Sequence, residues 1–95
     1  MPFRRNPRAP AVTGRGRLVF SRFDGEVDYE LARDPSQLGH GPKGIRGAIA
    51  ADPDTAARAF SAGDAFLTLA DGQTFRLKML AHTAGAGQAF FEMWR

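Results

Sequence analysis

Residues 18–31 read LVFSRFDGEVDYEL, two runs of β-forming residues around Asp24-Gly25. Asp-Gly between alternating apolar residues is a strong hairpin signal, because glycine accepts the left-handed backbone of a tight turn. A two-residue turn at Asp24-Gly25 pairs Phe20 with Tyr29 and Leu18 with Leu31. This register predicts an acidic outer face and one apolar inner face, formed by Leu18, Phe20, Val27, Tyr29 and Leu31.

A second Asp-Gly, at residues 71–72, predicts another hairpin. A three-residue loop, 70–72, with Gly72 in the left-handed conformation aligns the flanking runs 65–69 and 75–79. Arg76 and Lys78 then point outward, opposite an apolar face of Ala65, Leu67, Leu69, Phe75, Leu77 and Met79. Further strands are predicted over 45–50 and 89–94.

One helix is predicted over 53–61. Asp52 is a favoured N-cap residue, Pro53 suits the first helical position, and Gly63 follows the end. Ala56, Ala59 and Phe60 form its apolar stripe at helical spacing. The element order is β-β-β-α-β-β-β, so we expect a mostly β protein, a small six-stranded antiparallel barrel or rolled sheet with one short helix.

Length and composition indicate one domain. The chain has 95 residues and no cysteine, which excludes disulfide scaffolds and cysteine-bound zinc. Its apolar runs are too short for a membrane span or a signal peptide, so we expect a cytoplasmic protein with no membrane contact. Residues 1–14 contain three prolines and no apolar periodicity. They are interpreted as a flexible basic arm before a barrel domain at 15–95.

The charge is divided along the chain. Residues 1–22 carry six arginines and no acid, whereas residues 23–95 carry the other seven basic residues and all ten acidic ones. The arm and the body therefore attract each other or act together on an anionic ligand. The net charge of the body, −3, argues against nucleic acid as a partner.

Enzymatic motifs are missing from the sequence. None of the serines lies in a Gly-x-Ser-x-Gly elbow, and His40 and His82 lack the spacing of metal ligands. We therefore expect a non-enzymatic binding module with no catalytic residues, no metal site and no cofactor.

Two short motifs resemble a known family. Arg4 and Arg8 form an Arg-x-x-x-Arg before the first strand, and residues 34–39 read Asp-x-Ser-x-x-Gly between the second and third strands. Together with the strand order, they are similar to the two-part signature of PilZ domains, six-stranded barrels that bind the bacterial messenger cyclic di-GMP. The resemblance implies cyclic di-GMP as the ligand and a set of binding residues, namely Arg4, Arg5, Arg8, Asp34, Ser36 and Gly39.

Two other functions stay open. The basic arm suits a protein-interaction module that docks on an acidic partner and takes no small-molecule ligand. A nucleic-acid-binding barrel is the less favoured alternative. It would use the arm for charge and would stack bases on outward aromatic residues, for which strand parity offers Phe23, Phe66, Phe90 and Trp94.

Overall fold

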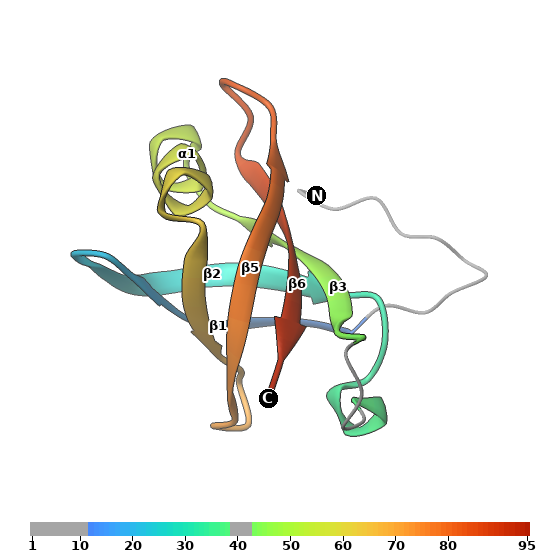
Figure 1. Ribbon diagram of the computed structural model, residues 1–95. Coiled ribbons are helices and arrows are strands. Elements are labelled where there is room, and N and C mark those ends of the chain that lie inside the picture. The colour runs from blue at the N-terminus through green and yellow to red at the C-terminus, as the bar shows by residue number, and fades with distance from the viewer. Residues whose placement is uncertain (1–11, 39–42) are drawn as a thin grey trace.

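The strands close into a six-stranded antiparallel barrel in the computed structural model, which describes residues 12–38 and 43–95 (Figure 1). Around the barrel the strands follow the order β1-β2-β3-β6-β5-β4, and β4 pairs with β1. This confirms the predicted fold class and element order. The elements are β1 (Val12–Phe20), β2 (Phe23–Leu31), the 3-10 turn η1 (Pro35–Gln37), β3 (Ile45–Ala50), α1 (Pro53–Ala62), β4 (Asp64–Thr68), β5 (Thr74–His82) and β6 (Gln88–Trp94).

The first hairpin turns at a different place from the predicted one. Phe20 pairs with Phe23, so Ser21 and Arg22 form the turn and Gly25 lies within β2. Arg22 has a φ of 61°, in the left-handed region that favours glycine. The prediction of a turn at Asp24-Gly25 was therefore wrong.

The predicted inner face is nevertheless confirmed. The partner of Phe20 moves from Tyr29 to Phe23, six positions along β2. A shift by an even number of residues leaves every side chain on its original face, because side chains in a strand alternate with a period of two. All five predicted inward residues are buried, namely Leu18, Phe20, Val27, Tyr29 and Leu31.

The observed register lengthens the first hairpin. It extends the pairing back to Val12, which lies opposite Leu31. Residues 12–14, which the sequence assigned to the arm, are therefore part of β1, and the boundary at residue 15 was three residues too late. Residues 1–11 lie outside the described part of the chain.

Two glycines in β1 allow the barrel to close. Gly16 lies where β1 meets β4, and a Cβ atom added there would lie 2.3 Å from the backbone oxygen of Thr68. The ring of Tyr29 occupies the space that side chains at Gly14 and Gly16 would need. Its hydroxyl accepts a hydrogen bond from the backbone N–H of Ala70 at 3.2 Å. Tyr29 thus links β2 to the loop after β4 through the barrel interior.

The predicted helix is confirmed, with its end one residue later at Ala62. The Asp52 carboxylate accepts hydrogen bonds from the Thr55 backbone N–H at 2.9 Å and from the Thr55 hydroxyl, and Gly63 ends the helix with a φ of 81°. Ala56 and Ala59 are buried in the core of the barrel. Phe60 was predicted on the same stripe, but it is 41% exposed and lies beside the ring of His82 at the rim.

The second hairpin follows the predicted register. Leu67 pairs with Phe75, and Gly72 has a φ of 93°. Its inward residues are buried, whereas Arg76 and Lys78 are exposed. The predicted register was therefore wrong for the first hairpin and correct for the second, but both predicted inner faces line the core.

We expect Gly16→Ala to lower the free energy of unfolding by about 1–3 kcal/mol, because the new methyl group overpacks the β1–β4 seam. Urea unfolding followed by circular dichroism measures this loss. Thr13→Ala is the control, since Thr13 is exposed on the same strand and its replacement should change stability by less than about 0.5 kcal/mol. Equal stability of the two variants would contradict the role assigned to Gly16.

Candidate functional site

Asp34 and Ser36 lie together on the turn between β2 and β3. Asp34 precedes η1, and its Oδ1 accepts a hydrogen bond from the Ser36 backbone N–H at 2.8 Å. Pro35 takes the first position of the turn, where no N–H is needed. Leu38 closes the turn by donating its N–H to the Pro35 oxygen, and its buried side chain anchors the turn to the core. Both polar side chains remain exposed.

The pairing of β1 with β2 sets the start of β1 beside the end of β2. Val12, the first residue of β1, lies opposite Leu31, the last residue of β2. Arg8 precedes Val12 by four residues, and Asp34 follows Leu31 by three. Arg4, Arg5, Arg8 and Gly39 lie outside the described residues. Chain connectivity therefore joins the arginine motif to the end of the barrel that carries Asp34.

Two further arginines flank the turn, and the sequence did not indicate either. Arg33 donates from Nη2 to the Gly44 oxygen at 3.4 Å, and Arg95 donates from Nη2 to the Pro35 oxygen at 3.5 Å. The guanidinium carbon of Arg95 also lies 6.0 Å from the ring centroid of Phe75. A guanidinium has five N–H donors, so each group retains donors for an anion. Arg33 adjoins the motif in sequence, but Arg95 reaches it only through the pairing of β6 with β3 and β5.

The far end of the β2–β3 connection is attached to β6. The Gly44 backbone N–H donates to Glu92 Oε2 at 2.9 Å. A Cβ atom at Gly44 would lie 2.4 Å from the backbone oxygen of Met93, so only glycine allows this close approach. Residues on both sides of the undescribed segment 39–42 are therefore held by the barrel.

Both negative and positive side chains lie around the turn. The Ser36 backbone N–H, followed by the Ser36 side chain, lowers the pKa of Asp34, which is ionised at neutral pH. Hydrogen bonds from Gln73 lower the pKa of Asp71, and the negative charge of Asp34 opposes this effect by raising it. Figure 1 shows η1, the β4–β5 loop and the end of β6 at the same end of the barrel. Carboxylates and guanidiniums therefore meet there, which suits a ligand with both hydrogen-bond donors and anionic groups.

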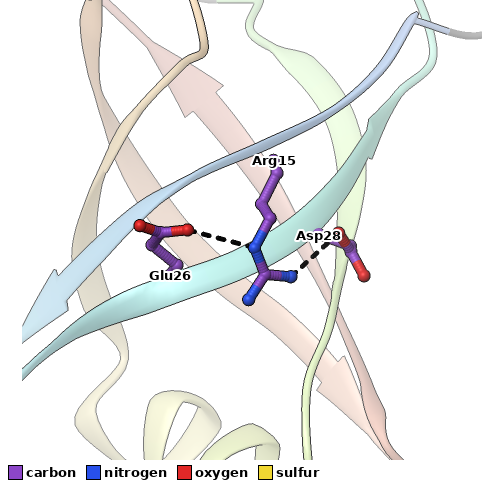
Figure 2. Close-up of polar contacts among 3 residues, drawn as sticks. All are labelled: Arg15, Glu26 and Asp28. Atoms are coloured by element: carbon purple, nitrogen blue, oxygen red, sulfur yellow. Dashed lines mark hydrogen bonds and ion pairs between the residues drawn. The ribbon is translucent and has the colours of Figure 1, made fainter.

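A second charged cluster lies on the outer surface of β1 and β2. Figure 2 shows Arg15 between Glu26 and Asp28, with Nε 3.1 Å from Glu26 Oε1 and Nη1 3.2 Å from Asp28 Oδ1. Arg17 pairs with Asp24 in the same way. These side chains are exposed and already neutralise one another, so the cluster is a solvated strand face, as the sequence predicted, and offers no binding site.

In residues 12–38 and 43–95 no three histidine, aspartate or glutamate side chains gather as metal ligands, and no helix has the length and apolar character needed to cross a membrane. Comparisons with protein-family models, curated proteins and solved structures found no match to this chain.

We expect an NMR titration to place the pKa of Asp34 below its ordinary value of 3.8. A lowered pKa in the folded state means that the carboxylate stabilises the turn above pH 3.8 and that this contribution disappears as pH falls through the folded pKa. Ser36→Ala should raise the pKa only in part, because the backbone N–H, the larger cause, remains. An unshifted pKa in the native protein would contradict the hydrogen-bonded turn.

Proposed function

We propose that the protein is a non-enzymatic binding barrel for cyclic di-GMP, with the ligand held between the N-terminal arginines and the β2–β3 turn. One observation carries the proposal. The Val12–Leu31 pairing holds the start of β1 beside the strand end that leads to Asp34, and Arg8 precedes Val12 by four residues, so we expect the two short motifs to act on one ligand. The proposal places the protein in the bacterial cytoplasm.

The residue types suit the chemistry of this ligand. Cyclic di-GMP carries two phosphates and two guanines, and guanidinium forks bind phosphate oxygens or the O6/N7 edge of guanine. Arg4, Arg5 and Arg8 would supply these forks. The Asp34 carboxylate accepts more than one hydrogen bond, so it can take an N–H donor of guanine while it still caps Ser36. The Ser36 hydroxyl and the backbone at Gly39 would complete the contacts.

The arginines found beside the turn extend this site. Arg33 and Arg95 approach the backbone of the β2–β3 connection from its two sides. A phosphate at the turn would therefore meet positive charge from the barrel as well as from the arm. This supports an anionic ligand at the turn despite the carboxylates of Asp34 and Asp71.

Isothermal titration calorimetry with cyclic di-GMP tests the proposal. We expect saturable binding by the full chain, with affinity reduced at least ten-fold in Arg8→Ala and in Asp34→Ala, since a hydrogen bond to a charged group contributes about 1.5–3 kcal/mol. Arg22→Ala is the matched control, because it removes an arginine from the opposite end of the first hairpin. This control should bind with unchanged affinity.

The outcome also separates the alternatives. A folded protein that does not bind at high micromolar cyclic di-GMP is not a sensor of this messenger. If a defined acidic protein instead binds through residues 1–11, which precede β1, and deletion of those residues abolishes that binding, the chain is a protein-interaction module.

A further inference from the structure

An outward-facing band of large side chains crosses four strands of the barrel. Strand pairing sets Val19 of β1 opposite Phe66 of β4, Phe66 opposite Arg76 of β5, and Arg76 opposite Trp94 of β6. Neighbouring strands lie about 4.8 Å apart, so these side chains form a continuous surface. Phe66 is 52% exposed, the largest exposed fraction among the large apolar side chains that the structure describes.

Two cations of β5 lie at this band, Arg76 within it and Lys78 beside it on the same strand. Arg76 and Lys78 both point outward from β5, and neither makes a hydrogen bond or an ion pair with any other described residue. An open depression lies beside the band, lined by Asp64, Arg76, Leu77, Lys78 and Trp94. The band thus combines an exposed aromatic ring with two cations whose donors are available to a ligand.

The outward charges differ between opposite walls of the barrel: β2 carries only acids, whereas β5 carries Arg76 and Lys78, with Asp64 and Glu92 opposite Lys78 on the neighbouring strands. The outward residues of β2 are acidic, namely Asp24, Glu26, Asp28 and Glu30. In the strand order β2 and β5 are directly across the barrel from each other. Arg15 and Arg17 form ion pairs with three of these four acids, Glu26, Asp28 and Asp24. The net charge of residues 23–95 therefore says little about the face around β5.

We propose that the outer face of β4, β5 and β6 binds single-stranded nucleic acid. A base stacks on the exposed ring of Phe66, and Arg76 and Lys78 hold the adjoining phosphates. Stacking on an aromatic ring tolerates any base, and free cations follow the phosphate backbone, which is how single strands are bound without sequence readout. This proposal is independent of cyclic di-GMP binding.

Fluorescence anisotropy with a labelled oligouridylate of about twelve nucleotides, a length suited to one small barrel, tests the proposal on the full chain. We expect Phe66→Ala to weaken binding on the order of ten-fold. Arg76→Ala and Lys78→Ala should each weaken binding and reduce the slope of log affinity against log salt by about 0.7, the value for one lost phosphate contact on a single strand.

Matched controls come from the same barrel. Phe90 is also an outward aromatic residue, 47% exposed, but its cross-strand neighbours are Ala48 and Ala81 rather than cations. Arg46 is an exposed arginine on β3. Phe90→Ala and Arg46→Ala should bind as the native chain does. If Phe66→Ala and Phe90→Ala bind equally, or if the native chain does not bind at low salt, the proposal is overturned.

Arginines of the N-terminal segment could bind an oligonucleotide by charge alone, and the same experiment detects this. Such binding would survive both Phe66→Ala and Arg76→Ala, which would overturn the assignment to β4, β5 and β6. Calorimetry on these two variants separates the two proposals, because their affinity for cyclic di-GMP should be unchanged. Circular dichroism confirms folding, which substitutions at exposed positions should leave intact.

Discussion

The placement of Tyr29 across Gly14 and Gly16 is the contact on which the rest of the barrel depends. Two missing side chains on the inner face of β1 make room for the tyrosine ring, and the absence of a Cβ at Gly16 lets the backbone of β4 approach. The tyrosine hydroxyl then satisfies the N–H of Ala70 on the β4–β5 loop. This single side chain connects β2 to the β4–β5 loop beside the seam, where residues 17–19 of β1 pair with residues 66–68 of β4 and close the sheet.

Closure leaves only the ends and the outer surface for binding, because apolar side chains fill the interior. The start of β1, the end of β2 and the end of β6 gather charged groups at one end. Along the wall, the strand order separates the acids of β2 from the cations of β5. The two proposed binding surfaces thus arise from one topology, and each uses side chains that packing leaves outside.

The candidate sites could be predicted only where their residues are close in sequence. Asp-Pro-Ser indicates a capped turn by itself, and the structure shows that Asp34 does cap it. Arg95 lies 60 residues from Pro35, and no local pattern relates them. The band of Phe66, Arg76 and Trp94 likewise depends on which strands are neighbours. The summed charge of the body does not describe any one face, because summing removes the direction in which each side chain points.

What the sequence determined by itself was the face on which each side chain lies, together with the helix and its caps. These depend on local rules: alternation with a period of two in strands, and hydrogen bonds within one turn at helix ends. Tertiary structure decided the position of the first turn. A shift by six residues leaves the inner face unchanged, so alternation cannot choose between Asp24-Gly25 and Ser21-Arg22. Three sets of contacts between residues distant in sequence select the turn at Ser21-Arg22. They are the longer pairing from Val12 to Phe20, the fit of Tyr29 over the glycines of β1, and the seam with β4.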